Sequence, residues 1–365
     1  MIISRTPYRI SFLGGGTDYP TWYRKHGGAV LATTIDKFCY LSCRYLPPFF
    51  EHRIRLVYSA IEACKSVDEI RHPAVRATLQ YLKFDRGIEI HHDGDLPARS
   101  GMGSSSSFTV GLLHALHALQ GRMPSKNELA LQAIEIEQHI INETVGSQDQ
   151  ILAAHGGFNH VTFDQSGHIS CRPVTVSPAK LKELDSHLML FYTGIKRTAS
   201  NVAGSYANEQ QMDAKKRQLR ILKDLVTEGL EILTGHQDIN LFGELLHEAW
   251  LAKSALSEKV TNDKVDELYA AARSAGAIGG KLAGAGGGGF LLLFVPPHLQ
   301  PNIIEKLNNL IHVPFKFERQ GTQIIFYDVE TDYAALELAR MKQNPSYVFE
   351  ELNPEESIWL PQDIT

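Results

Sequence analysis

The sequence predicts an α+β protein built from two domains, and three observations support this prediction. The chain has 365 residues, and at roughly 150 residues per domain this length suggests two units with at least one sizeable core. Strand-like runs dominate residues 9–91, whereas residues 203–275 are strongly helical. Strands and helices that are segregated in this way indicate α+β layers and not a regular alternation of single strands and helices.

The first half is predicted to open as a sheet covered by helices. Strand-like runs lie at residues 9–13, 29–45, 54–58 and 87–91, and a helix is expected at 74–84. Two further helices are predicted over residues 104–119 and 126–142. The second of these begins with a capping-box pattern, in which Ser125 precedes Glu128 by three positions. We expect both helices to pack on the sheet.

The second half is predicted to be helical first and strand-rich at its end. Short strands expected at 158–163 and 169–176 precede a domain boundary near residue 180, and the run LMLFY at 188–192 begins the second unit. Closing strands are expected at 290–295, 313–317 and 323–329, with a helix at 300–311. The predicted domains therefore span residues 1–180 and 181–330, followed by a tail, residues 331–365, that forms a helix and an extended arm.

The composition excludes several classes of protein. A hydrophobic content of 43%, a charged content of 21% and a net charge of −5 describe an ordinary globular chain without a basic surface for nucleic acid. The longest apolar runs are far shorter than the roughly 20 residues that span a bilayer, and the N-terminal residues lack the pattern of a signal peptide. We expect a cytoplasmic monomer or homodimer with no nucleic-acid or membrane partner.

The four cysteines and sixteen histidines form no recognisable disulfide framework or metal-binding pattern. Only Cys39 and Cys43 are close in sequence, and no CxxC or HxxxH pattern accompanies them. We expect reduced, partly buried thiols and no histidine-based metal site.

Three clusters rich in glycine or serine stand out, at residues 14–16, 101–107 and 284–289. The middle cluster, GMGSSSS, runs directly into an apolar helix. Glycines let a ligand approach the backbone closely, and the free N–H groups and dipole at a helix N-terminus favour anions. A flexible linker or a simple helix cap would also be rich in serine, but linkers are rarely fused to a buried helix. The cluster therefore favours a phosphate-binding loop.

Familiar nucleotide-binding motifs are absent or out of place. The pattern GxxxxGK[ST] fails around Gly280 and Lys281, because Ala275 and Leu282 occupy the positions of the first glycine and the hydroxyl. The GxGxxG match at 284–289 precedes a strand and does not open a helix, so the dinucleotide geometry is missing. A tight turn explains part of this cluster, although four consecutive glycines exceed what one turn requires. The HRD and DFG motifs of protein kinases are also missing.

Two carboxylates downstream of the serine-rich loop are candidates for phosphoryl transfer, which uses carboxylate and hydroxyl ligands for Mg²⁺ and an acid that orients the nucleophile. In an α-helix over residues 126–142, Glu137 shares its face with apolar residues and Glu135 does not. A buried charge is costly unless it is paired or metal-bound, so Glu137 is either a metal ligand or half of a structural ion pair. Asp149, twelve positions later, is by itself more typical of a helix N-cap than of a catalytic acid.

Three motifs, in order, resemble those of the GHMP small-molecule kinases, which include galactokinase and mevalonate kinase. They are TPYRISFLGGGTDYP at 6–20, PARSGMGSSSSF at 97–108 and KLAGAGGGGF at 281–290. The resemblance covers about residues 1–330 and implies an N-terminal ribosomal S5-like α/β domain that binds ATP and a C-terminal ferredoxin-like α+β domain. Within the superfamily the motifs most closely resemble bacterial D-glycero-D-manno-heptose 7-phosphate kinases. Galactokinases show GEHTDY where this chain has GGGTDY at 14–19, which argues against galactose.

The resemblance implies roles for individual residues. It places Mg²⁺ ligation on Ser105 and Glu137, catalysis on Asp149 with Arg9 as its basic partner, and binding of sugar hydroxyls on Asp18. The residues implied to bind ATP are Pro97, Gly101, Met102, Gly103, Ser104, Ser105, Ser106 and Ser107. The other candidates for substrate binding are Gly15, Gly16, Thr17, Lys196, Arg197, Lys281, Gly284, Gly286 and Gly287. The three cations of this set would suit a phosphate on the substrate, and are equally well explained as solvated surface charges.

These features predict an ATP- and Mg²⁺-dependent sugar kinase. The expected acceptor is the sugar phosphate D-glycero-D-manno-heptose 7-phosphate, phosphorylated on its anomeric C1 hydroxyl to give the 1,7-bisphosphate for nucleotide-activated heptose synthesis. The alternatives are another sugar kinase such as an L-fucose kinase, a non-catalytic sugar sensor on the same fold, and a dinucleotide oxidoreductase. Turnover of ATP separates a kinase from a sensor, and absence of NAD binding removes the oxidoreductase.

Overall fold

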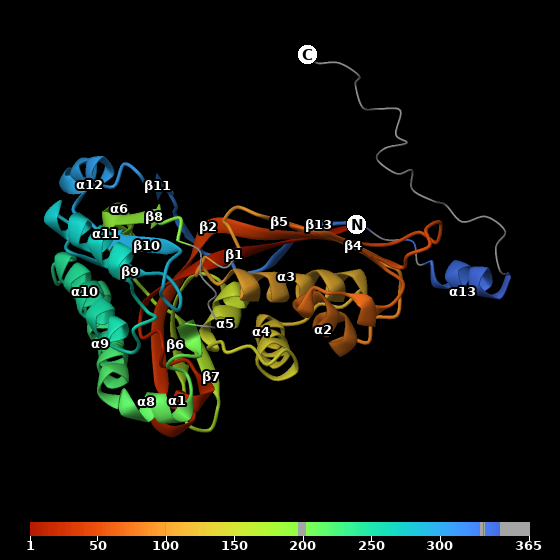
Figure 1. Cartoon of the computed structure of the whole chain (residues 1–365), viewed down its shortest axis with the longest axis horizontal. Helices are drawn as coiled ribbons and strands as arrows, with labels where there is room; N and C mark the ends of the chain where they lie inside the picture. The colour runs from red at the N-terminus through yellow and green to blue at the C-terminus, as the bar shows by residue number, and fades with distance from the viewer. Residues whose placement is uncertain (99, 196–201, 329–330, 332, 344–365) are drawn as a thin grey trace, which may run out of the picture.

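The computed structural model describes residues 1–98, 100–195, 202–328, 331 and 333–343, and it confirms the α+β class (Figure 1). Within these residues the strands form a nine-stranded sheet and a four-stranded sheet. Helices of the first half cover one face of the larger sheet, and helices of the second half lie beside the smaller one (Figure 1).

The larger sheet is built around a long antiparallel pair, β1 (Ile2–Leu13) and β2 (Gly28–Tyr45). Residues 6–13 of β1 are all buried, which explains why this part of the strand shows no alternation of apolar and polar residues. The main path of the sheet is β13-β1-β2-β5-β3-β4. Its other strands are β3 (Ile54–Val57), β4 (Ile61–Cys64), β5 (Ile88–Gly94) and β13 (Gln323–Tyr327), with β6 (Phe158–Phe163) beside β2 and β7 (Ile169–Pro173) beside β6.

Helix α3 (Ser104–Leu119) has the predicted bounds and packs against both β1 and β2. Helix α4 (Lys126–Ile134) begins at the predicted capping box, because the Ser125 hydroxyl accepts the N–H of Glu128 and the Glu128 carboxylate accepts the N–H of Ser125. The remaining helical segments of this half are α1 (Pro20–His26), η1 (Val67–Glu69), α2 (Pro73–Tyr81) and α5 (Gln148–His155).

The prediction of one continuous α-helix over residues 126–142 is wrong beyond Ile134. Residues Glu135–Ile140 form a π-helical segment, η2, whose wider turns follow an i to i+5 hydrogen-bonding pattern. The N–H of Ile141 accordingly donates to the carbonyl of Ile136 at 2.9 Å. The apolar face assigned to Glu137 from α-helical spacing therefore does not apply, although the residue is buried by the π turn.

The smaller sheet has the order β11-β8-β10-β9, and its three pairings are antiparallel. Its strands are β8 (Leu188–Tyr192), β9 (Gly279–Leu282), β10 (Phe290–Phe294) and β11 (Ile311–His312). Strand β9 was not among the predicted strands, and it packs against helix α10. The helical segments of this half are α6 (Pro178–His187), α8 (Glu209–Ala214), α9 (Lys216–Thr234), α10 (Asn240–Ser254), α11 (Asp263–Ser274), η3 (Pro297–Leu299) and α12 (Gln300–Lys306).

The chain returns to the larger sheet near its end. The strand predicted at 313–317 is replaced by β11 in the smaller sheet and by β12 (Phe317–Glu318), which pairs with β2. Strand β13 then pairs with β1. Strand pairing thus links residues 317–327 to the first half, while the domain limits at 180 and 330 stay a prediction.

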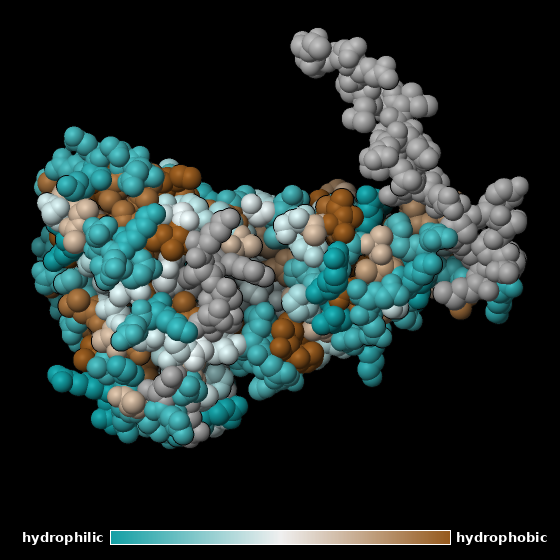
Figure 2. Space-filling model, in the orientation of Figure 1, coloured by the Kyte–Doolittle hydropathy of each residue, from teal (hydrophilic) through white to brown (hydrophobic). Residues whose placement is uncertain are grey.

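The tail begins with the predicted helix, α13 (Ala334–Gln343), and the expected extended arm lies outside the described residues. The face shown in Figure 2 is largely hydrophilic, with apolar side chains in small separate patches. Among the helices that the structure describes, none combines the length and the apolar character needed to cross a membrane.

Candidate active site

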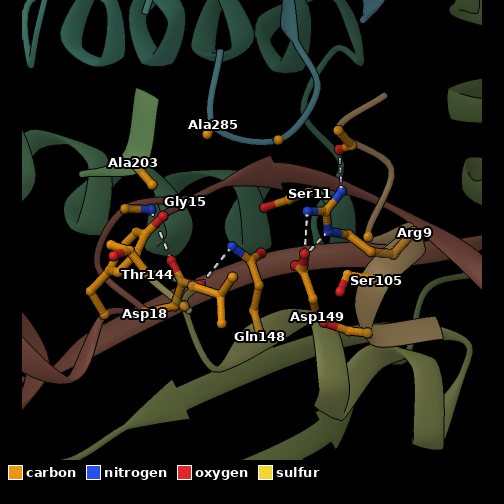
Figure 3. A pocket seen from close by; sticks show the side chains of 18 of the residues that line it. Arg9, Ser11, Gly15, Asp18, Ser105, Thr144, Gln148, Asp149, Ala203 and Ala285 are labelled. Carbon is orange, nitrogen blue, oxygen red and sulfur yellow. Dashed lines mark hydrogen bonds and ion pairs between the residues drawn. The ribbon is translucent and has the colours of Figure 1, made fainter. Parts of the chain in front are cut away.

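A pocket of about 310 Å³ lies between β1, the start of α3 and elements of the second half (Figure 3). Its walls come from the loop after β1, the segment 143–149, helix α10, strand β9 and the glycine-rich loop that follows β9. Segments from all three glycine clusters therefore meet at one place, as their chemistry suggests.

The serine-rich loop presents the N-terminus of α3 to this pocket. Gly103 has a φ of 76° and precedes the helix, and the first helical hydrogen bond joins the N–H of Ser107 to the Gly103 carbonyl. The N–H groups of the first turn have no partner within the helix, and the helix dipole adds partial positive charge at the same end. A Cβ at position 103 would lie 3.2 Å from Cγ of Arg9, so glycine also allows close packing here.

Five of the eight predicted ATP-binding residues line the pocket, namely Gly101, Gly103, Ser104, Ser105 and Ser106. The other three do not line it. Met102 is fully buried in the core, and its carbonyl accepts the N–H of Arg9. The Ser107 hydroxyl donates to the carbonyl of Pro7 inside the protein, and Pro97 is exposed.

Arg9 and Asp149 form a bidentate ion pair at one end of the pocket (Figure 3). Nε of Arg9 donates to Oδ1 of Asp149 and Nη2 donates to Oδ2, both at 2.7 Å, and Nη1 donates to the carbonyl of Gly101 at 2.7 Å. The Arg9 side chain is 5% exposed and that of Asp149 is 24% exposed, so the carboxylate is held firmly and still faces the pocket. The N-cap of α5 is Ser147, so Asp149 is not the cap residue but lies in the first turn.

Glu137 is fully buried and is surrounded by neutral donors. Its carboxylate accepts hydrogen bonds from Ser106 Oγ and Thr109 Oγ1 at 2.8 Å and from Gln150 Nε2 at 2.5 Å, with Ser105 Oγ at 3.4 Å. No ion pair to Glu137 occurs among the described residues, which argues against the structural ion pair. Burial raises the pKa of Glu137 to about 7, and the hydrogen bonds from Thr109, Ser106 and Gln150 oppose this rise.

This donor set fits a hard divalent cation. Carboxylate and hydroxyl oxygens are the ligands that Mg²⁺ prefers, and a cation would offset the cost of the buried charge. Ser105 is exposed, lines the pocket and lies beside Glu137, so it connects the buried carboxylate to the pocket. Within the described residues no group of three or more His, Cys, Asp or Glu side chains could hold a metal ion, so serine would have to contribute a ligand.

Asp18 is held at the opposite end of the pocket. It is 2% exposed, and its two oxygens accept the N–H of Gly16 at 2.9 Å and Nε2 of Gln148 at 2.8 Å (Figure 3). Burial and the nearby charge of Asp149 raise the pKa of Asp18. A Cβ at Gly146 would lie 1.9 Å from Oδ2 of Asp18, so this carboxylate fits directly against the backbone.

The other predicted substrate-binding residues divide into two groups. Gly15, Gly16, Lys281 and Gly284 line the pocket, whereas Thr17, Gly286 and Gly287 do not. The buried Thr17 hydroxyl bonds to the carbonyls of Gly14 and Ala29, and Gly286 and Gly287 pack against Val260. Lys196 and Arg197 lie outside the described residues.

Lys281 lines the pocket, but its ammonium group already makes hydrogen bonds within the protein. Its ammonium donates to the carbonyls of Ser11 and Phe12 at 2.9 and 2.8 Å. Burial, with the nearby charges of Lys253 and Arg9, lowers the pKa of Lys281 well below its ordinary value. These contacts favour a role in holding β1 over direct contact with a substrate phosphate.

The sequence interpretation missed several lining residues. Ser11, Gln148 and Lys253 are each more than nine-tenths buried and line the pocket, as do the paired rings of Tyr19 and Tyr206. Ser11 lies two positions after Arg9 on one strand, and Gln148 directly precedes Asp149, so both positions carried a local signal. Lys253 lies in the last turn of α10, and no local sequence pattern connects it with the pocket.

Two family models match the chain. The model for the "GHMP kinases N terminal domain" matches residues 65–157, and that for the "GHMP kinases C terminal" matches residues 223–312, together about half of the chain. With the fold and the pocket described above, these matches show that the chain belongs to the GHMP kinases. It is therefore an ATP-dependent phosphotransferase that acts on an alcohol group.

Several of the similar proteins are sugar kinases. A D-glycero-alpha-D-manno-heptose 7-phosphate kinase of Campylobacter jejuni is 28% identical over 84% of this chain and 93% of that protein. An L-fucokinase/L-fucose-1-P guanylyltransferase of Bacteroides fragilis is 26% identical over 80% of this chain but only 34% of that protein. A solved structure of a D-glycero-D-manno-heptose 1-phosphate kinase from Bacteroides thetaiotaomicron has a TM-score of 0.72 at 23% identity, covering 89% of this chain and 99% of that chain. At this identity the structural match shows the shared fold.

Proposed function

We propose that this sugar kinase uses ATP with Mg²⁺ to phosphorylate the anomeric C1 hydroxyl of D-glycero-D-manno-heptose 7-phosphate. The observation that carries the proposal is the placement of the Arg9–Asp149 pair in one pocket with the N-terminus of α3 and with Asp18. The similarity to the Campylobacter jejuni enzyme extends over most of both chains and supports the choice of heptose.

In this proposal Asp149 acts on the acceptor hydroxyl. Arg9 fixes both oxygens of the Asp149 carboxylate, and the open part of that carboxylate accepts the proton of the hydroxyl or orients it toward the γ-phosphate. Arg9 remains beside the reacting groups and helps to neutralise the charge that develops during transfer. Asp18 anchors the sugar at the other end of the pocket.

The start of α3 binds the ATP phosphates through the backbone N–H groups and hydroxyls of Ser104, Ser105 and Ser106. When bound, Mg²⁺ neutralises charge on the phosphates, and Ser105 and Glu137 are the residues that would hold it. Contact of Lys196, Arg197 and Lys281 with a substrate phosphate remains a proposal. Lys281 is the weakest candidate of the three, because its ammonium already donates to two backbone carbonyls.

A panel of acceptors tests this function. The purified protein is assayed with ATP and Mg²⁺ on D-glycero-D-manno-heptose 7-phosphate, the unphosphorylated heptose, L-fucose and D-galactose, with the Asp149→Asn variant as control. We expect the highest kcat/KM for the heptose 7-phosphate and a new C1 phosphate by phosphorus NMR. A preference for L-fucose or D-galactose would assign another sugar kinase, and absence of turnover with every acceptor would favour the sugar sensor.

A further inference from the structure

Gly15 occupies a position where the backbone does not demand glycine. Its φ lies outside the left-handed region, whereas the neighbouring Gly14 and Gly16 have φ values of 83° and 108°. A Cβ built on Gly15 would meet its nearest neighbours at 3.4 to 3.9 Å, which is ordinary van der Waals contact. An alanine would therefore fit among the surrounding protein atoms without strain, so neither backbone conformation nor packing explains the glycine.

The atoms that surround this missing side chain are polar and come from three distant segments. They are Ser11 Oγ at 3.4 Å, Lys253 Nζ at 3.8 Å and Gln148 Nε2 at 3.9 Å from the Cβ position. Each of these three residues is more than nine-tenths buried, and each lines the pocket. Glycine at position 15 thus keeps open a small space that a hydroxyl, an ammonium and an amide surround.

Two of these side chains have buried atoms without a partner. Ser11 Oγ and Gln148 Oε1 make no hydrogen bond with any residue that the structure describes. The orientation of the Gln148 amide is set by Asp18, because Nε2 donates to Oδ2 of that carboxylate at 2.8 Å. Its carbonyl oxygen is therefore left as an acceptor on the side toward Asp149 (Figure 3). Buried polar groups without partners are rare and indicate a missing ligand or water.

We propose that Ser11, Gly15, Gln148 and Lys253 form a subsite for the acceptor hydroxyl adjacent to the reacting one. A hydroxyl donates one hydrogen bond and accepts others. Here it donates to Gln148 Oε1 and accepts from Lys253 Nζ or Ser11 Oγ, while Gly15 provides the space. The inference rests on the proposed binding of a sugar between Asp18 and Asp149, and it assigns the hydroxyl at C2 when the reacting hydroxyl is at C1.

The first test is a thermodynamic cycle in which the Gln148 amide and the substrate 2-hydroxyl are removed separately and together. Kinetics are measured for the wild type and Gln148→Met on D-glycero-D-manno-heptose 7-phosphate and its 2-deoxy analogue, with Gln132→Met as a matched control outside the pocket. We expect Gln148→Met to lower kcat/KM at least tenfold for the parent sugar and less than twofold for the 2-deoxy analogue. Equal losses on both sugars would overturn the subsite, because Gln148 would then act without contacting this hydroxyl.

The second test fills the space with a methyl group. Gly15→Ala should raise the KM for the acceptor at least tenfold, with an unchanged KM for ATP and an unchanged urea midpoint. Ser11→Ala should raise the acceptor KM without destabilising the protein, since its hydroxyl has no hydrogen-bond partner among the described residues. An unchanged acceptor KM in Gly15→Ala would refute the proposal, whether or not the Gln148 variant folds.

Failure of the proposed heptose substrate can be separated from failure of the subsite. If the acceptor panel identifies L-fucose or D-galactose instead, the same cycle is run with that sugar and its 2-deoxy analogue. Coupling between Gln148 and the 2-hydroxyl would then support the subsite on a different sugar. Equal losses on that pair would overturn the subsite while leaving the kinase function intact.

Discussion

Replacing Glu137 by glutamine should make the protein without metal more stable above neutral pH, although it removes a proposed ligand. The Glu137 carboxylate is fully buried, and burial raises its pKa from the ordinary 4.5 to about 7. Above this pH the folded protein carries a buried charge that hydrogen bonds from neutral groups offset only in part. A glutamine has nearly the same shape and never ionises, so the variant avoids the cost of that charge.

The magnitude and sign follow from the two pKa values of Glu137. Because the folded protein binds this proton more tightly than the unfolded chain, stability is highest below pH 4.5, falls as the pH rises to 7, and then stays constant. Each pKa unit is equivalent to about 1.4 kcal/mol, so the buried charge costs about 3 kcal/mol at pH 8.5. The variant should gain about this amount at pH 8.5 and much less at pH 5.

Urea denaturation at pH 5 and pH 8.5 with EDTA measures this difference, and Glu135→Gln serves as a control because Glu135 is an exposed residue of the same π-helical segment. Mg²⁺ should stabilise the wild type at pH 8.5 and should not stabilise Glu137→Gln, which should also lose kinase activity. A stability difference that is the same at both pH values, or absent, would refute the argument from burial. Equal stabilisation of both proteins by Mg²⁺ would refute only the metal role.

Three further substitutions test the pocket. Asp149→Asn should lower kcat at least a hundredfold, while calorimetry should still detect ATP binding. A kcat near that of the wild type would show that Asp149 takes no part in the reaction. Asp18→Ala should lower kcat/KM for the acceptor by about 1.5–3 kcal/mol, the range for hydrogen bonds to charged groups, and a parallel change in the KM for ATP would contradict its placement. Gly146→Ala should give a similar acceptor defect because its Cβ would collide with the Asp18 carboxylate, and wild-type steady-state kinetics would show that Asp18 can move without consequence.

The sequence predicted best those features that depend on neighbours along the chain. Helix α3 has the predicted bounds because a continuous apolar segment follows a glycine-rich loop, and the capping box at Ser125 is a local pattern. The π-helical segment η2 was missed because single insertions into helical spacing leave no clear periodicity over six residues. Strands β4 and β9 were missed because their runs, IEAC and GGKL, contain few β-branched or aromatic residues, whereas the equally short β3, IRLV, contains two.

The site was predictable only in part because it is assembled from distant segments. The first motif contains Arg9 and Asp18, and the family resemblance assigned a role to Asp149; the structure brings all three to one pocket. The positions of Ser11, Gln148 and Lys253 around Gly15 depend on how β1, α5 and α10 pack, which no local pattern reveals. Lys281 was identified as a possible phosphate contact from its charge alone, but its burial and its two carbonyl partners could be known only from the fold.

The pairing of β1 with β13 makes the order of synthesis matter for folding. Residues 2–5 are synthesised about 320 residues before their partners on one side, which are residues 323–327. Until those residues emerge, this part of β1 presents unpaired N–H and C=O groups, and such open edges recruit other strands. We therefore expect nascent or C-terminally truncated chains that lack β13 to aggregate and to depend on chaperones, even when every residue of the pocket is present.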